Sequence, residues 1–136
     1  AQAQDAAAAA PALAPTPVAI VSGPVSVDQV RAQWAAMRKA YLDSSAAYAT
    51  QPEHSTLLKE YNTLLDETGK SLEGYIALRL ARSAPATLTP AVDKLIGNLT
   101  RLKAMQAKAS GNLITVLGNA LKQQQMITQN AIKNMR

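Results

Sequence analysis

The chain has 136 residues, of which 48% are hydrophobic and 17% charged, and its formal net charge is +5. This is the length of one domain. It contains no Cys and one His, which excludes disulfides, thiol chemistry and metal centres built from several Cys or His side chains. It contains no run of 18 apolar residues, so we expect no membrane-spanning helix.

Residues 1–25 are rich in Ala and Pro, a composition that cannot bury a core and favours extended backbone. We therefore predict an extended N-terminal tail, with Val18, Ile20 and Val21 as candidate partner-binding residues because all three are apolar and β-branched. The small residues at the start of the sequence, without an initiating Met, are typical of a chain whose signal peptide has been removed. We expect export to the periplasm or the cell surface.

Residues 26–136 predict an antiparallel three-helix bundle, so the fold class is all-α. The first helix, about 26–49, is expected to begin with a capping box formed by Ser26 and Gln29. Pro52 separates it from a second helix, about 52–84, because Pro disfavours a helical residue before it and suits a first helical turn. Both segments repeat apolar residues at steps of three and four, as packed helices do.

The third helix is predicted over about 90–134, beginning at the N-cap Thr89 and Pro90. Its apolar residues keep one heptad phase from Val92 to Ala120, which favours one long helix of a coiled-coil type. The alternative is a break at Gly111, with the last segment folded back as a fourth helix.

Aromatic residues at seven-residue spacing form one line on each of the first two helices. We expect them to build an aromatic core seam of Trp34, Tyr41, Tyr48, Tyr61 and Tyr75. The predicted layers pair Trp34 with Tyr75, Tyr41 with Thr68, and Tyr48 with Tyr61.

An unbroken third helix would be much longer than the second at about 1.5 Å per residue, and its end would project beyond the bundle. Ile127, Ala131 and Met135 lie on one side of this expected overhang. They are therefore predicted to bind a protein partner or a second copy of the chain.

Residues able to act in catalysis or to bind a cofactor or metal are few and do not form a motif. No nucleophile elbow, phosphate-binding Gly loop or metal-ligand cluster occurs, so we expect no enzyme, no catalytic residues and no cofactor or metal site. Residues 93–136 hold seven Lys or Arg against Asp93, which makes the third helix basic. An anionic membrane surface or an acidic protein is a candidate partner, whereas nucleic acid is not expected because this helix lacks stacking aromatics.

Several short sequences of the C-terminal half carry a resemblance, which covers residues 105–130. They are Met105-Gln106-Ala107, Gly111-Asn112-Leu113, Ala120, Gln123-Gln124-Gln125 and Gln129-Asn130. The segment resembles the long C-terminal helix of the minor pilins of conjugative type IV secretion systems, which assemble at the pilus tip or the channel stalk. The resemblance implies an exported, helical and non-enzymatic protein.

Two hypotheses follow. The first is an exported, non-enzymatic helical subunit of a cell-envelope or secretion/pilus assembly, which acts through protein–protein contacts. The alternative is a self-contained periplasmic or lumenal binding module, such as a chaperone, an immunity protein or an accessory subunit of a membrane complex. A break at Gly111 that gives four comparable helices would favour the alternative.

Overall fold

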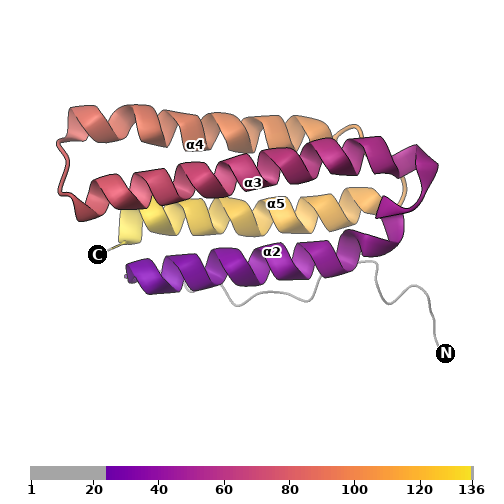
Figure 1. The fold of residues 1–136 in the computed structure, drawn as a ribbon, viewed down its shortest axis with the longest axis horizontal. Coiled ribbons are helices and arrows are strands. Elements are labelled where there is room, and N and C mark those ends of the chain that lie inside the picture. Colours follow the sequence, from indigo (N-terminus) through magenta and orange to yellow (C-terminus); the bar gives the residue numbers. More distant parts are fainter. Residues whose placement is uncertain (1–23, 136) are drawn as a thin grey trace.

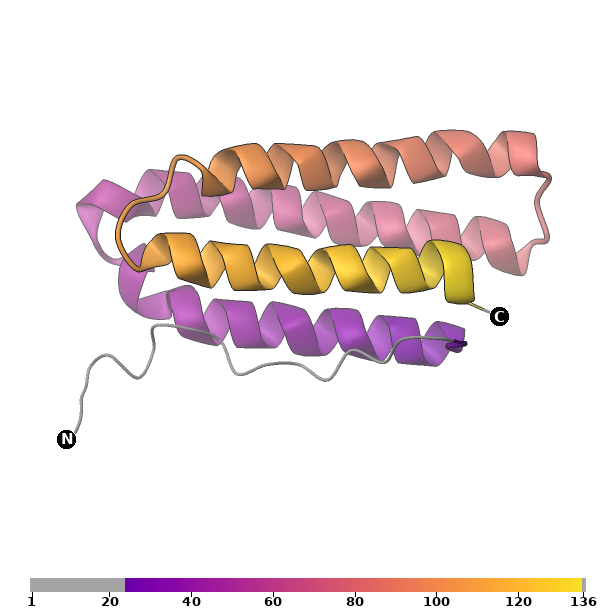
Figure 2. The ribbon, with the colours of Figure 1, turned by 180° about the vertical axis from the view of Figure 1, so that it is seen from behind.

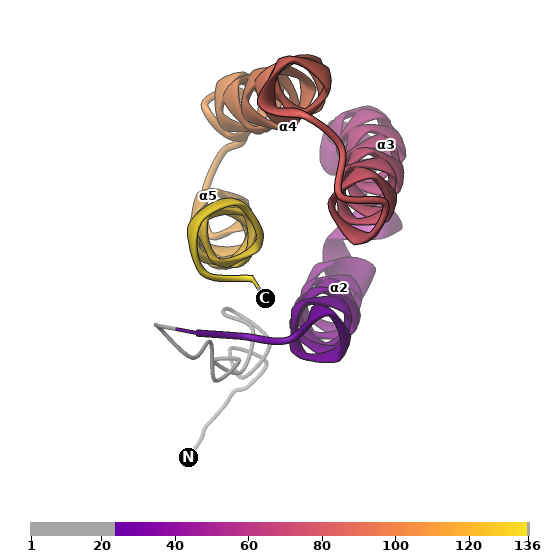
Figure 3. The same cartoon turned by 90° about the vertical axis from the view of Figure 1, so that its left-hand side faces the viewer.

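The computed structural model describes residues 24–135, and this part of the chain is an all-α bundle of four helices without strands (Figure 1). The helices are α2 (Val27–Ala49), α3 (Pro52–Leu80), α4 (Pro85–Gln106) and α5 (Leu113–Gln129), and α5 continues into a π-helical turn, η2 (Asn130–Asn134). Successive helices run antiparallel, and in the end-on view they follow one another around the bundle from α2 to α5 (Figure 3). The all-α prediction is confirmed.

The start of α2 follows the sequence prediction. Ser26 is the N-cap, its hydroxyl accepts a hydrogen bond from the backbone N–H of Gln29 at 3.1 Å, and the Gln29 side chain accepts from the Ser26 N–H at 2.8 Å. This capping box satisfies two N–H groups that the first turn of a helix leaves unpaired. Pro52 opens α3, also as predicted.

The connection between α3 and α4 differs from the prediction. Helix α3 ends at Leu80 rather than near residue 84, and α4 begins at Pro85 rather than Pro90. Pro85 occupies the first turn of α4, where the missing N–H costs no helical hydrogen bond. Pro90, which was predicted to begin this helix, lies inside it, a little more than one turn after Pro85.

The single long third helix is wrong, because the chain turns at Gly111. This residue has a φ of +60°, in the left-handed region that glycine adopts at little cost. Helix α4 ends at Gln106 and α5 begins at Leu113, so residues 107–112 reverse the chain. The heptad phase continues across the turn because both helices direct their apolar residues at the same core.

The expected overhang is therefore absent. Helix α5 runs back along the bundle beside α2 (Figure 2), and this places its apolar stripe in the core. Ile127 and Ala131 are fully buried and Met135 is 5% exposed. Burying each large apolar side chain contributes roughly 1.5–3 kcal/mol, so folding α5 back outweighs the small entropy of closing a short loop.

The C-terminal turn is held by contacts from two other elements. Arg79 of α3 donates from Nη2 to the carbonyl oxygen of Met135 at 2.6 Å and from Nη1 to that of Ala131 at 3.2 Å. The Val25 N–H donates to the carbonyl of Asn134 at 3.1 Å, and this contact forms an isolated parallel bridge between Val25 and Met135. Because the last carbonyls of a helix lack partners within the helix, these donors fix the end of η2.

The aromatic residues pack in a different register from the one predicted. The rings of Tyr41 and Tyr61 lie 5.3 Å apart between centroids, and Tyr48 contacts His54. Trp34 lies against Gly69, where an added Cβ would come within 2.9 Å of the indole nitrogen. The predicted layers are wrong because the link between α2 and α3 is only Thr50 and Gln51, which leaves no room for the assumed stagger.

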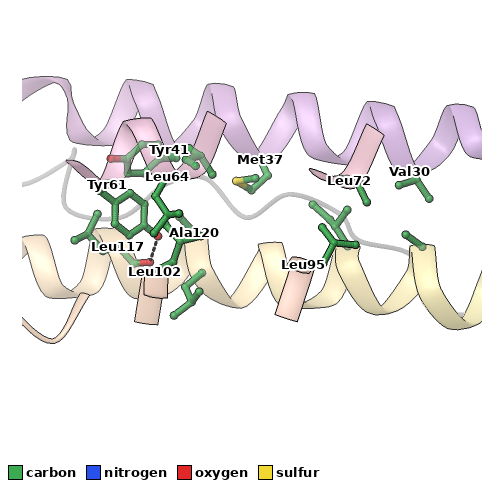
Figure 4. Close-up of a cluster of buried hydrophobic side chains, with 14 of the residues drawn as sticks. Val30, Met37, Tyr41, Tyr61, Leu64, Leu72, Leu95, Leu102, Leu117 and Ala120 are labelled. Carbon is green, nitrogen blue, oxygen red and sulfur yellow. Dashed lines mark hydrogen bonds between the residues drawn. The ribbon is translucent and has the colours of Figure 1, made fainter. Parts of the chain in front are cut away.

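Tyr41 and Tyr61 lie side by side in the core, with Leu64 of α3, Leu102 of α4 and Leu117 of α5 around them (Figure 4). The Tyr41 hydroxyl donates to Oδ1 of Asn62 at 2.5 Å, and the Tyr61 hydroxyl donates to the carbonyl of Leu117 at 3.4 Å. Burial raises the pKa of both tyrosines above the ordinary phenol value. Both phenols are therefore protonated hydrogen-bond donors at neutral pH.

The turn at Gly111 gives the first prediction. Gly111→Ala should lower the free energy of unfolding by about 1–2 kcal/mol, because a Cβ is strained at positive φ. The matched control is Gly74→Ala, in the interior of α3, where nothing lies within 4 Å of the added Cβ. This change should instead raise the free energy of unfolding, by about 0.5–1 kcal/mol. Urea denaturation measures both, and equal stabilisation would contradict a turn at Gly111.

Arg79 gives the second prediction. Arg79→Met keeps the apolar stem but removes the donors to the C-terminal carbonyls, so the free energy of unfolding should fall by about 2 kcal/mol. Amide hydrogen exchange over residues 127–135 should accelerate more than elsewhere. Lys70→Met, at an exposed position of α3, is the control and should change neither quantity appreciably. Unchanged exchange in Arg79→Met would show that the turn does not depend on this side chain.

Candidate functional site

The residues predicted as sites have three different outcomes. Val18, Ile20 and Val21 lie outside the described residues. Ile127, Ala131 and Met135 are buried within their own chain, so they stabilise the fold and do not form an exposed partner surface. Of the aromatic seam, Tyr41, Tyr61 and Tyr75 are buried, whereas Trp34 and Tyr48 are partly buried and pack against the core.

The charges of α2 and α3 balance one another. These two helices carry six Lys or Arg and seven Asp or Glu. The three ion pairs found among residues 24–135 all lie here: Arg31 with Glu73, Arg38 with Asp66, and Lys39 with Asp43. The Glu73 carboxylate accepts hydrogen bonds from both Nε and Nη2 of Arg31, and this interaction raises the pKa of the Arg31 guanidinium. This half of the bundle is close to electrically neutral.

The other half of the bundle is strongly basic. Residues 85–135 contain six cations and one acid, Asp93, a net charge of +5. The cations, all exposed, are Lys94, Arg101, Lys103, Lys108, Lys122 and Lys133. Within the described part of the chain, none of them is among the ion pairs. The sequence predicts this excess for a single third helix, whereas the structure divides it among α4, the α5–η2 helix and the loop between them.

A groove of about 540 Å³ lies between α4 and the α5–η2 helix. Its apolar lining is Val92, Ile96, Leu99 and Ile132, and its polar lining is Thr100, Lys103, Gln125, Thr128, Gln129 and Lys133. The groove is open to solvent, and Ile96 is 51% exposed. We name it the α4–α5 groove.

The two lysines lie toward opposite ends of the α4–α5 groove. Lys103 is in the last turn of α4, close to the loop that joins α4 to α5, whereas Lys133 is in η2, at the far end of the antiparallel partner. No carboxylate lines the groove between them. The groove therefore combines an apolar lining with positive charge toward both ends and no internal counter-charge.

The hollows beside α3 have a different character. The one between α3 and α4 near Arg101 is also lined by Lys59, Glu60 and Glu67. The next one along α3 contains Glu67 together with Lys70 and Lys94. Both contain acids beside their bases: the first hollow has two of each, and in the second Glu67 offsets one of two lysines. Compared with these two hollows, the α4–α5 groove lacks that compensation.

One buried polar side chain also faces this groove without a partner. Thr128 lines the groove and is 2% exposed, and its hydroxyl has no hydrogen-bond partner among the described residues. A buried hydroxyl without a partner costs free energy, and native proteins usually satisfy such groups. A polar group brought to the groove would have this hydroxyl nearby.

Neither a membrane-spanning helix nor a metal-binding cluster is found within residues 24–135. None of the helices described is both long and apolar enough to cross a bilayer. No group of three or more Asp, Glu or His in this range is arranged to hold a metal ion. The α4–α5 groove is therefore the strongest candidate site.

Comparison with known proteins adds no further assignment. No protein-family model matches the chain, and no similar curated protein or solved structure was found.

Sequence reasoning missed the groove because it joins residues from two helices that were expected to be one. The heptad phase from Val92 to Ala120 predicts one long helix, and Ile96 lies outside that phase. The signal that was present is Ile96 with Lys103, seven residues apart and so on the same face of a helix.

Proposed function

We propose that this chain is a non-enzymatic, self-contained helical binding module that recognises an acidic partner protein through α4 and α5. The observation that carries the proposal is the segregation of charge: α2 and α3 hold six cations against seven acids, whereas residues 85–135 hold six exposed cations against Asp93. An excess of exposed cations over acids in this half of the bundle attracts a partner of opposite charge.

The bundle supports a self-contained module better than an assembly subunit. The assembly hypothesis depended on an uncovered C-terminal overhang, and the apolar residues of that segment are buried in the chain's own core. Four helices of comparable length close around that core (Figure 3). The resemblance to minor pilins, and a periplasmic location, remain hypotheses that rest on the sequence alone.

The test of this proposal uses poly-L-glutamate as an acidic polypeptide. We expect the full chain to bind it, with an affinity that falls as salt concentration rises because exposed charges are screened. Changing Lys103→Glu and Lys133→Glu together should weaken binding by roughly fivefold to thirtyfold, as expected for the loss of two exposed pairs. Isothermal titration calorimetry at two salt concentrations measures this.

The matched control is the double variant Lys59→Glu with Lys70→Glu, which changes the total charge equally but on α3. It should weaken binding less than the groove variant does. Equal weakening would mean that only net charge matters, and this would contradict recognition through α4 and α5. Stronger binding to duplex DNA or to phosphatidylglycerol vesicles than to poly-L-glutamate would instead overturn the acidic-protein partner.

A further inference from the structure

We propose that the α4–α5 groove binds an amphipathic helix of the partner, about three turns long, with a carboxylate near each end. This inference rests on the proposed function and specifies which surface of the module is used and what occupies it. The groove combines the three features that such an occupant needs: apolar side chains along its length, a cation toward each end, and no acid of its own.

The length of the groove matches a short helix. It follows α4 from Val92 to Lys103, which is about 16 Å along a helix. A helix of about eleven residues covers the same distance and presents apolar residues at steps of three and four to Ile96 and its neighbours. It would lie beside α4 and α5 as an additional helix of the bundle.

The polar residues of the groove favour a peptide over an acyl chain. Thr100, Gln125 and Gln129 lie among the apolar side chains, and the buried Thr128 hydroxyl lacks a partner among the described residues. A lipid chain would contact these groups without hydrogen bonds, whereas the side chains of a peptide can donate and accept them. The groove is also partly open to solvent, which a helix laid into it requires.

The charges fix the acidic character of the occupant. Lys103 and Lys133 are exposed and outside the ion pairs seen among residues 24–135. Carboxylates toward the two ends of the bound helix would lie beside them, and the partial desolvation of an interface strengthens such pairs relative to free solvent. A neutral amphipathic helix would bury the same apolar area without this contribution.

The experiment measures the anisotropy of a labelled, designed peptide of about 14 residues, long enough for three helical turns. The peptide carries one apolar stripe and a Glu pair at each end, and a scrambled peptide of identical composition lacks the stripe. We expect the full chain to bind the designed peptide at least about tenfold more tightly than the scrambled one. A Gln-for-Glu version should bind more weakly and with less dependence on salt.

Two variants locate the binding. Ile96→Glu places a negative charge on an exposed position of the groove and should weaken peptide binding by at least about tenfold. Leu80→Glu is the control, because Leu80 is 59% exposed but lies at the end of α3 outside the lining of the groove. Circular dichroism establishes that both variants are folded.

The outcomes separate this inference from the proposed function. Peptide binding that survives Ile96→Glu, or equal binding of the scrambled peptide, would overturn the groove assignment. If poly-L-glutamate binds through α4 and α5 but the designed peptide does not, the acidic partner stands and its helical form is wrong. Saturable binding of dodecanoate that Ile96→Glu abolishes, with no peptide binding, would assign the groove to an acyl chain and overturn the inference.

Discussion

The return of α5 along the bundle is the constraint on which the rest of the structure depends. Leu113, Leu117 and Ile127 have nothing else in the described chain to cover them if the helix continues straight past residue 111. A left-handed residue is the simplest way to end α4 and reverse the chain, and Gly111 adopts that conformation without the strain of a Cβ. The hydrophobic gain of closing the core is large compared with the cost of the short turn.

The C-terminal end of the α5–η2 helix needs hydrogen-bond donors from elsewhere in the chain, because the last carbonyls of a helix have no partners within the helix. Arg79 supplies a cation at the negative end of the helix dipole, and its guanidinium also lies 5.7 Å from the centre of the Tyr75 ring. Gln33 accepts a hydrogen bond from Asn130 at 3.4 Å, which links the same turn to α2. The two chain segments that flank the helices, at Val25 and Met135, are thereby brought together.

Residues that begin helices predicted part of the fold correctly, whereas the apolar periodicity did not show where the last helix breaks. The capping box at Ser26 and the Pro52 start are local chemistry, and both were predicted correctly. The heptad phase through Ser110 reports which residues face the core but not whether the backbone is continuous, so it could not distinguish one helix from two. The basic character of the C-terminal half was visible in composition, whereas the α4–α5 groove exists only once the two helices lie side by side.

The same reversal that buries the apolar stripe of α5 also creates the basic surface. With one extended helix, Lys103 and Lys133 would lie about 45 Å apart along a single rod, at ~1.5 Å per residue. The turn at Gly111 instead places them on two antiparallel helices, where both line one groove with Ile96 between them. Three of the seven acids of α2 and α3 pair with Arg31, Arg38 and Lys39, and none of the seven lines this groove. A single backbone conformation therefore completes the core and leaves an uncompensated positive surface, the property by which we expect this protein to select its partner.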